Sequence, residues 1–284
     1  MAKIGVIGGS GLYEMDGLTD VCEVSVRTPF GDPSDAIVTG RLGGVELAFL
    51  PRHGRGHRIS PSELPVRANI YALKSLGVQW VISVSAVGSL REDIKPLHLV
   101  IPDQIIDRTK RRPDTFFEGG IVAHCAFAEP YCPHLSGILH QAAQKTRATV
   151  HKGGTYVAIE GAQFSTKAES ALYRSWGASV VGMTALPEAR LAREAELCYA
   201  TLASVTDYDC WYESEESVSV HMIVSNLLRN VAAAKKIVRY AAQAIHQERK
   251  CACASALEDT IITVRERIPA EVKERLQLLI GKYL

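Results

Sequence analysis

A run of glycines with one serine follows the first apolar segment of the chain. Gly8 to Gly11, a stretch that includes Ser10, comes directly after residues 3–7. Glycine lets the backbone turn sharply and present its N–H groups to an anion, so this loop suits a phosphate group. A dinucleotide-binding loop is a rival interpretation, but Glu14 stands where the G-x-G-x-x-G pattern needs its third glycine. A plain tight turn after a strand is equally compatible with these residues.

A basic segment follows the apolar run that ends at Leu50. Residues 51–58 contain five side chains that can carry positive charge. Arg52 and His53 are nearest the expected strand end, where a planar guanidinium can hold two phosphate oxygens at once. Bound phosphate would raise the affinity of His53 for a proton and so give a charged hydrogen bond. A solvated basic loop is the alternative, and we favour it for the other two arginines.

Two further polar stretches come after apolar runs. Ser85 and Ala86 open the sequence SAVGS after residues 80–84, and we expect a polar turn whose hydroxyl and amides face an anion. Thr184 precedes a helical pattern, and the amino end of a helix favours negative charge. Helix capping alone would explain this threonine, and Met183 beside it is more commonly core filler than a ligand contact.

Two aspartates close the apolar run at residues 199–205. Asp207 and Asp209 are separated only by Tyr208. If the strand continues, both side chains point to the same face and both carboxyl groups can meet one ligand. The alternative is a loop whose acids cap a following turn, and the residues taken alone favour it.

Short β-branched segments precede most of these polar residues, and we expect them to be strands. They are residues 3–7, 45–50, 80–84, 99–101, 156–159, 180–181 and 199–205. Several are continuously apolar, as in strands covered on both faces. Helical periodicity separates them, for example at Val66, Ile70 and Leu73 and over residues 224–245. The alternation predicts an α/β fold over 1–284 as a single domain, with a central mixed, mainly parallel twisted sheet flanked by helices.

Composition narrows the class of protein. The 284 residues are 47% hydrophobic and 22% charged, enough to bury a full core. Lys and Arg number 32 against 31 Asp and Glu, so we expect no nucleic-acid partner. The start suits no signal peptide, and no apolar stretch approaches the ~20 residues that a bilayer needs. We therefore expect a cytoplasmic protein with no membrane partner.

The cysteines are seven in number and scattered, which argues against a secreted disulfide framework. Cys251 and Cys253 are the exception, because only one residue separates them. A redox or metal site is conceivable, but two thiols alone cannot fill a tetrahedral zinc shell. We favour ordinary thiols or an optional disulfide, and we expect no metal.

Taken in order, these motifs resemble the methylthioadenosine phosphorylase branch of the purine nucleoside phosphorylase family. The resemblance covers nearly the whole chain, through residues 4–13 (IGVIGGSGLY), 28–35, 52–57 (RHGRGH), 85–94, 103–117, 128–133, 159–170, 182–195 (GMTALPEARLAREA) and 206–211 (TDYDCW). It implies a pentosyltransferase that splits S-methyl-5′-thioadenosine with inorganic phosphate as co-substrate and with no cofactor. A phosphorylase for 6-oxopurine nucleosides or methylthioinosine is the alternative, and a hydrolase and a nucleotide sensor are more distant rivals.

The resemblance also implies roles for individual residues. Phosphate would be surrounded by Ser10, Arg52, His53, Ser85, Ala86 and Thr184. Met183 would pack beneath the ribose and Phe164 against the base. Residues 161–164 read Gly-Ala-Gln-Phe where the family usually has Gly-Pro-x-Phe, so the pose of this loop is left open.

The two aspartates then match the edge of adenine. Asp209 would accept a hydrogen bond from the amino group, and Asp207 would be the catalytic acid that protonates N7. Keeping Asp207 protonated at neutral pH needs its pKa raised by about three units, on the order of 4 kcal/mol, which burial beside a second acid can supply. Relatives that act on 6-oxopurines have Asn in place of Asp207 and Glu in place of Ser165.

At the other end of the nucleoside, Val220 and Ile223 are apolar and suit a methylthio group, whereas relatives that bind a 5′-hydroxyl place a histidine there. His221 is the immediate neighbour, and a shift of one position would let it meet a hydroxyl. The resemblance implies a homotrimer in which His124 of an adjacent subunit approaches the methylthio end. An ordinary surface or core histidine is the alternative.

Overall fold

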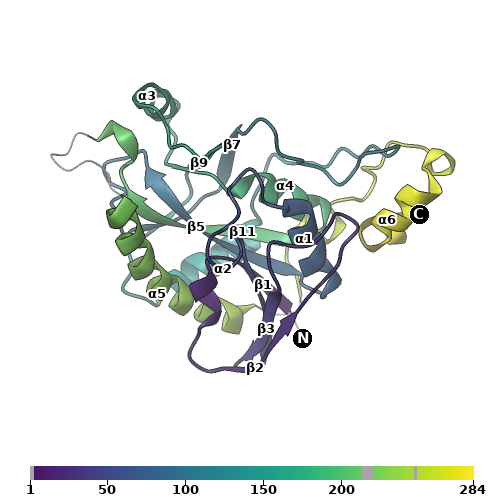
Figure 1. Cartoon of the computed structure of the whole chain (residues 1–284), viewed down its shortest axis with the longest axis horizontal. Coiled ribbons are helices and arrows are strands. Elements are labelled where there is room, and N and C mark those ends of the chain that lie inside the picture. Colours follow the sequence, from purple (N-terminus) through teal and green to yellow (C-terminus); the bar gives the residue numbers. More distant parts are fainter. Residues whose placement is uncertain (1–2, 213–219, 246–247) are drawn as a thin grey trace.

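The computed structural model describes residues 3–212, 220–245 and 248–284, and leaves out the side chains at positions 10, 13, 220–223 and 227. The strands are β1 (Lys3–Gly8), β2 (Leu18–Val24), β3 (Ile37–Leu42), β4 (Val45–Pro51), β5 (Trp80–Ser89), β6 (Leu99–Ile101), β7 (Gln104–Arg108), β8 (Val150–Lys152), β9 (Thr155–Ile159), β10 (Val180–Gly182) and β11 (Cys198–Asp207). The α-helices are α1 (Val66–Ser75), α2 (Pro133–Gln144), α3 (Lys167–Ser175), α4 (Ala185–Glu194), α5 (Val220–Ala244) and α6 (Ala270–Ile280). Figure 1 shows their arrangement, with α6 projecting at one end.

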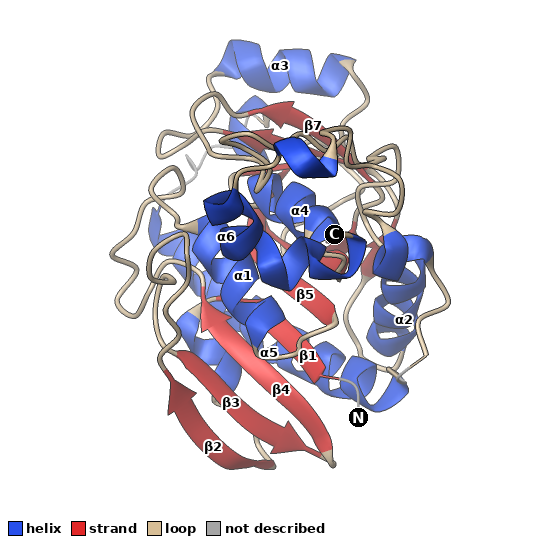
Figure 2. Cartoon of the chain, turned by 90° about the vertical axis from the view of Figure 1, so that its right-hand side faces the viewer, coloured by secondary structure: helices blue, strands red, loops and turns tan. Residues whose placement is uncertain are grey.

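The strands form one continuous twisted sheet (Figure 2) in the order β2-β3-β4-β1-β5-β10-β9-β7, and β11 joins β5 to β6 and β8. Pairing is parallel for β1 with β4 and β5, for β11 with β5, for β9 with β7 and β10, and for β6 with β8. It is antiparallel between β2, β3 and β4, between β10 and β5, and between β11 and β6. The predicted mixed and mainly parallel sheet flanked by helices is therefore confirmed.

Apolar side chains cover both faces of the central strand β5. Trp80 and Ile82 pack into a core shared with α2 and α5, whereas Val81 packs into a second core shared with α1 and α4. Successive strand residues point to opposite faces, so an uninterrupted apolar run is what a strand between two helical layers requires. The view in Figure 1 places α5 and α1 on opposite sides of β5 and β11.

Strand β5 also has a gap in its strand pairing along one edge. Residues 80–83 pair with β1, and residues 88–89 pair with β10. Because β11 pairs along the opposite edge of β5, β1 and β10 share one edge and neither reaches residues 84–87. Backbone and side-chain groups of this unpaired stretch are left for other partners, as expected where a strand order changes direction.

The structure differs from the expected elements mainly around this strand. Residues 85–89 were expected to form a polar turn, which is wrong: β5 continues to Ser89, because β11 pairs with it as far as Gly88. Strands β2, β3, β7 and β8 were not expected. The burial pattern of β2 is mostly exposed, so it carries neither the continuous nor the alternating apolar signal of a strand.

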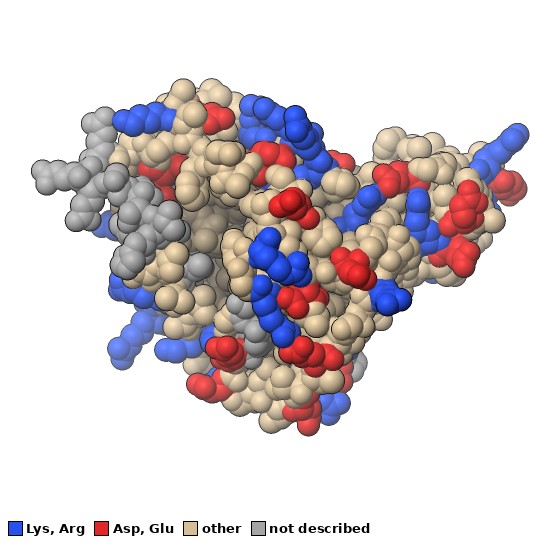
Figure 3. All heavy atoms as spheres, viewed as in Figure 1, with Lys and Arg blue, Asp and Glu red and all other residues tan. Residues whose placement is uncertain are grey.

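Positively and negatively charged side chains are intermixed on the surface. On the face drawn in Figure 3, Lys and Arg side chains are interspersed with Asp and Glu, and a hollow lies left of centre. Among the helices that the structure describes, none combines the length and apolar character needed to cross a bilayer.

Candidate active site

Arg52 lies beside the gap in the pairing of β5, in a buried ion pair with Glu188. Its Nε donates to Oε1 of Glu188 at 2.5 Å, and its Nη2 donates to Oε2 at 3.1 Å. Nη1 donates to the carbonyl of Val84 at 2.8 Å, and Nη2 also donates to Ser83 Oγ at 2.7 Å. Burial is the largest single effect and lowers the pKa of Arg52, but the charge of Glu188, its hydrogen bonds and the nearby tyrosines together raise that pKa overall. The guanidinium is thus held rigidly, with much of its charge compensated inside the protein.

Three hydroxyl groups gather next to this ion pair. Ser85 and Thr184 both lie beside the hydroxyl of Tyr156, and the charge of Arg52 acts on the same group. The hydroxyls of Ser85 and Tyr156 are buried and have no hydrogen-bond partner among the described residues. Thr184 occupies the N-cap position of α4 but makes no capping hydrogen bond, so capping does not explain it. Buried polar groups left unpaired are uncommon and point to a bound polar group.

His53 follows Arg52 at the end of β4. Its Nδ1 lies 2.8 Å from the carbonyl oxygen of Ile59, which fixes the proton of the neutral ring on Nδ1. Burial and then the positive charge of Arg52 lower the pKa of His53 to about 4. The ring also stacks on His57 at 4.2 Å between centroids. His53 is therefore neutral at pH 7 in the ligand-free protein, and a charged form requires an anion beside it.

The remaining residues of the expected phosphate site take positions around the same gap. Ser10 opens the short 3₁₀ helix η1 (Ser10–Tyr13) directly after β1, and its side chain lies outside the description. The carbonyl of Gly8 at the end of β1 accepts from the backbone N–H of Arg52 at 2.9 Å, which joins the two loops. Ala86 is exposed within β5, on the stretch that neither β1 nor β10 covers.

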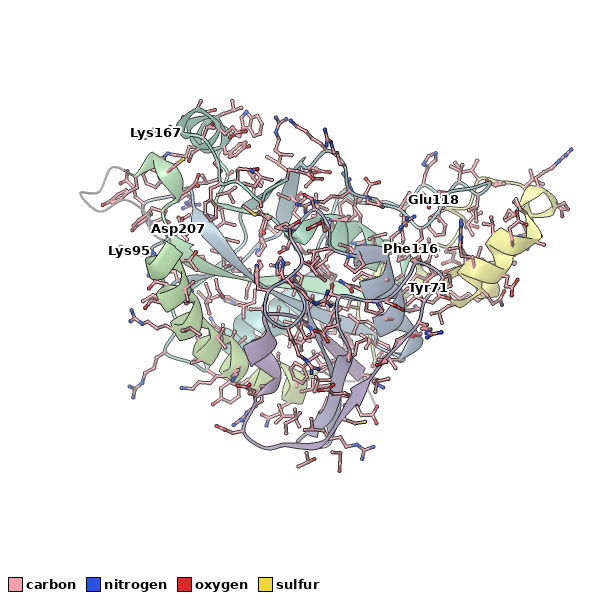
Figure 4. All side chains as sticks on the ribbon, in the orientation of Figure 1. Tyr71, Lys95, Phe116, Glu118, Lys167 and Asp207 are labelled. Carbon is pink, nitrogen blue, oxygen red and sulfur yellow. The ribbon has the colours of Figure 1, made fainter. Side chains whose placement is uncertain are left out.

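Asp207 and Asp209 are brought together by a turn and not by a continuing strand. Strand β11 ends at Asp207, and Asp209 begins a 3₁₀ turn with φ of 51°, a left-handed conformation that aspartate tolerates. The backbone N–H of Asp209 donates to Oδ1 of Asp207 at 2.8 Å. Both residues press on Gly88, where an added Cβ would lie 3.0 Å from Asp207 Oδ1 and 3.2 Å from Asp209 Cβ. In Figure 4 Asp207 lies at the end of the molecule away from Phe116 and Glu118.

The two carboxyl groups have different surroundings. Burial raises the pKa of Asp207, although hydrogen bonds from Thr206 Oγ1 and from the N–H of Asp209 oppose the shift. Burial also raises the pKa of Asp209, whose neighbours include Ser165 and Ser170. Oδ2 of Asp209 and the hydroxyls of both serines are buried without a hydrogen-bond partner among the described residues. This end of the gap thus contains a second set of unpaired polar groups.

The loop between these two groups passes close to Met183. Gly161 has φ of 70°, and a Cβ there would lie 2.6 Å from Sδ of Met183, so only glycine fits without a shift. Arg112 holds the loop in place, because its guanidinium donates hydrogen bonds to the carbonyls of Glu160 and Met183. Met183 is half-buried, and Phe164 exposes 64% of its surface. An aromatic ring this exposed is available to cover an apolar or aromatic ligand.

Three expected contacts are not brought to the site by the described residues. Val220 and Ile223 lie in the first turns of α5, and with His221 their side chains fall outside the description. His124 is exposed in an extended segment, where its N–H donates to the carbonyl of Thr260 at 3.0 Å. Its position is beside the C-terminal segment and not beside β5.

Sequence reasoning missed the partners that hold these residues. Glu188 was not expected in the site, and Tyr156 was expected only as part of a strand. Ser170 carried no signal, because a serine in a helix is ordinary. Each becomes visible only when distant segments meet, as for Glu188 and Arg52, which are 136 positions apart.

Comparison with known proteins agrees with this geometry. Residues 3–243 match the profile of the Phosphorylase superfamily. The chain is 61% identical over 282 residues to the S-methyl-5′-thioadenosine phosphorylase of Geobacter sulfurreducens, with 99% of each chain covered. It is 56% identical over 287 residues to the enzyme of the same name from Thermosynechococcus vestitus, with 100% of this chain and 99% of the relative covered.

Solved structures give the same result. A methylthioadenosine phosphorylase from an Antarctic soil metagenomic library superposes with a TM-score of 0.94 at 51% identity, and 98% of each chain is covered. The methylthioadenosine phosphorylase of Schistosoma mansoni, in complex with adenine, superposes with a TM-score of 0.81 at 35% identity, covering 99% of this chain and 98% of that one.

Proposed function

The chain belongs to the Phosphorylase superfamily, and from that premise we propose that it catalyses the phosphorolysis of S-methyl-5′-thioadenosine to adenine and 5-methylthioribose 1-phosphate. Inorganic phosphate is the co-substrate of this reaction. The names of the relatives at 56–61% identity support the choice of nucleoside. The enzyme would be a pentosyltransferase that recovers a purine base and a thiosugar for salvage.

The observation that carries the proposal is that buried polar groups without hydrogen-bond partners lie at two places along β5. Buried hydroxyls at Ser85 and Tyr156 lack partners at one end, and Asp209 Oδ2 lacks one at the other, among the residues that the structure describes. Ser85 and Gly88, against which Asp209 packs, are three residues apart, or about 10 Å along a strand. That spacing leaves room for a sugar between an anion and a purine.

The phosphate end supplies fixation of the nucleophile. We assign the hydroxyls of Ser85 and Thr184 as donors to the phosphate oxygens, together with Ser10, the backbone near Ala86, and Arg52 with His53 behind them. Phosphate held beneath C1′ of the sugar stabilises the positive charge that develops as the glycosidic bond breaks, and then attacks that carbon. The glycosidic bond breaks, the C1′–O bond to phosphate forms, and no covalent enzyme intermediate is needed.

The purine end supplies the proton that the leaving group needs. Asp207 is buried and has a raised pKa, which favours the protonated form that can give its proton to N7. Asp209 has an oxygen, Oδ2, with no partner among the described residues, and it can accept a hydrogen bond from the 6-amino group. Phe164 would cover the base, and Met183 would lie under the ribose.

Selection for a 6-aminopurine follows from the same groups. A 6-oxo group facing Asp209 would place two acceptors against each other, and a buried mismatch of this kind lowers affinity strongly. Ser165 is short and leaves the space that a longer acidic side chain would fill. Val220 and Ile223 remain proposed contacts of the methylthio group, and His221 remains a candidate contact of a 5′-hydroxyl.

We also propose that the protein works as a homotrimer. Val122, beside His124, and Ile262 and Val264, on the adjoining C-terminal segment, expose 48–63% of their surfaces. Ile262 N–H donates to the carbonyl of Val122 at 2.9 Å, so these apolar side chains lie on neighbouring extended segments. A second subunit covering them would carry His124 toward its neighbour's nucleoside. We place the trimer, with each 1–284 chain as one domain, in the cytoplasm and with no nucleic-acid or membrane partner.

Rates with different nucleosides test the proposal. Methylthioadenosine, adenosine and methylthioinosine are each incubated with phosphate, and the released base is measured by chromatography. We expect methylthioadenosine to exceed methylthioinosine by at least about 100-fold in kcat/KM, since the oxo base leaves buried groups unpaired. Equal rates on the two bases would instead support the 6-oxopurine alternative.

A further inference from the structure

Four cysteines converge at the end of the molecule where β11 begins. Cys132 precedes α2, Cys198 is the first residue of β11, and Cys251 and Cys253 flank the start of the 3₁₀ helix η3 (Ala252–Ser255). The sulfur atoms all lie within 4.8 Å of one another, and Sγ of Cys198 is 3.4 Å from Sγ of Cys251. All four are free thiols in the structure, so the optional disulfide between Cys251 and Cys253 is not formed. Cys132 and Cys198, from two distant segments, thus supply the two further thiols that Cys251 and Cys253 alone lack for a tetrahedral zinc shell.

This arrangement has the dimensions of a tetrahedral thiolate site. With zinc–sulfur bonds of about 2.3 Å, the sulfurs of such a site lie about 3.8 Å apart. Cys132, Cys198 and Cys253 are buried, with exposed fractions of 1%, 0% and 4%. Four protein ligands and no open position define a structural and not a catalytic zinc site. Soft thiolates in a tetrahedron select zinc over the harder cations.

Helix α2 and the segment before Cys251 bring polar groups next to the cluster. Sγ of Cys132 accepts a hydrogen bond from the N–H of Leu135 at 3.4 Å in the first turn of α2, where the helix dipole is positive. Arg249 and Lys250 directly precede Cys251, and the N–H of Lys250 donates to His134 Nδ1 of the same helix at 3.2 Å. The hydrogen bond from Leu135 and the positive end of the α2 dipole favour a thiolate at Cys132.

We propose that Cys132, Cys198, Cys251 and Cys253 bind one zinc ion in a closed tetrathiolate site that fastens the C-terminal segment to the sheet. Each thiol releases its proton to solvent as its sulfur–zinc bond forms, and no atom changes oxidation state. The fastened segment includes residues 248–284, which lie beyond the 3–243 that match the superfamily. Asp207 is nine residues further along β11, about 30 Å away, so the ion takes no part in phosphorolysis.

Metal analysis of the protein purified without chelator or added metal tests this site. We expect about one zinc per chain by mass spectrometry, and loss of at least about nine-tenths of it in Cys253→Ser. Cys22→Ser is the matched control, because Cys22 is exposed and lies outside the cluster. Cys253→Ser should melt at a lower temperature, with kcat and KM for methylthioadenosine unchanged below that temperature.

A second measurement keeps the test decisive if Cys253→Ser does not fold. Zinc is removed from the unaltered protein, cobalt(II) is added, and we expect the intense visible bands of tetrahedral cobalt thiolate. The proposal fails if the protein takes up neither metal, if iron occupies the cluster as purified, or if peptide mapping without reductant finds these four cysteines in disulfides. None of these results would bear on the phosphorolysis assay.

Discussion

Arg52 and Glu188 form a buried two-point ion pair between the end of β4 and the start of α4. The side chains are 3% and 2% exposed, and Ser83 and Tyr199 both donate further hydrogen bonds to Oε2 of Glu188, at 3.1 and 3.0 Å. Charges buried this deeply are held in place only when both partners and their hydrogen bonds are present. The pair therefore fixes the position of Arg52 under the proposed phosphate site.

Removing the charge of Glu188 should disturb phosphate binding more than nucleoside binding. In Glu188→Gln the guanidinium loses its compensating charge, and we expect destabilisation of about 3 kcal/mol. The KM for phosphate should change by at least about tenfold, equivalent to 1.4 kcal/mol, with a smaller change for the nucleoside. Denaturant unfolding and initial rates at varied phosphate measure the two effects. Glu46→Gln, which removes an exposed ion pair with Arg41, is the control, and equal behaviour of the two variants would contradict this role.

Replacement of Asp207 tests the proton donor. Asp207→Asn keeps a hydrogen-bonding group of the same shape but cannot protonate N7, so kcat should fall by about 100-fold or more. Phosphate binding, measured by calorimetry, should be unchanged. Asp93→Asn on the exposed surface is the control. Near-normal kcat in Asp207→Asn would remove Asp207 from the chemistry.

The pH dependence of kcat tests the role of Asp207 as proton donor independently. Because burial raises the pKa of Asp207, the protonated form persists above the usual range of an aspartic acid. Activity that depends on this form is present below the raised pKa and is lost as pH rises through it. We expect a falling alkaline limb of kcat in the unaltered protein and a flatter profile in Asp207→Asn.

Phosphate binding should add a proton to His53. Without ligand the pKa of His53 is about 4, so the ring is neutral at pH 7, and an anion beside it raises that pKa. Calorimetric titration with phosphate in two buffers of different ionisation enthalpy measures the proton taken up. We expect uptake that disappears in His53→Gln. The same apparent enthalpy in both buffers would show that His53 stays neutral.

The buried carboxyl group of Glu194 should make the stability of the folded protein depend on pH, independently of catalysis. Burial raises its pKa to about 7, although Phe116 N–H and Thr115 Oγ1 donate hydrogen bonds to it. A carboxyl with a raised folded-state pKa contributes stability that is full below its unfolded pKa and is lost as pH rises through about 7. Glu194→Gln should abolish this loss, on the order of 1–3 kcal/mol between pH 4.5 and 7. Melting curves that decline in parallel for both proteins would contradict the assignment.

The sequence predicted those parts of the fold whose signal is local. Continuously apolar segments correctly identified β1, β4 and β11, because strands buried on both faces need such runs. The exposed strand β2 was missed for the same reason. The end of β5 was placed wrongly, because its last residues are polar and only pairing with β11 keeps them extended.

In the candidate site, too, local motifs were predictive and tertiary contacts were not. The residues expected to bind phosphate and base were identified from motifs and from family resemblance, and Arg52, Ser85 and Thr184 do lie together around Tyr156. What holds them was not predictable, because Glu188 reaches Arg52 only through the tertiary fold. Two arrangements were open for the aspartates, a continuing strand and a turn, and the residues alone favoured the turn; the structure has a left-handed turn at Asp209.

The central claim is that phosphate, and not water, displaces the purine. Phosphorus NMR of a reaction with methylthioadenosine and inorganic phosphate, combined with chromatography of the base, measures this directly. We predict a growing sugar phosphate ester signal that matches adenine one for one, and no adenine when phosphate is left out. Adenine released at the same rate in phosphate-free buffer, with the inorganic phosphate signal constant, would contradict the account.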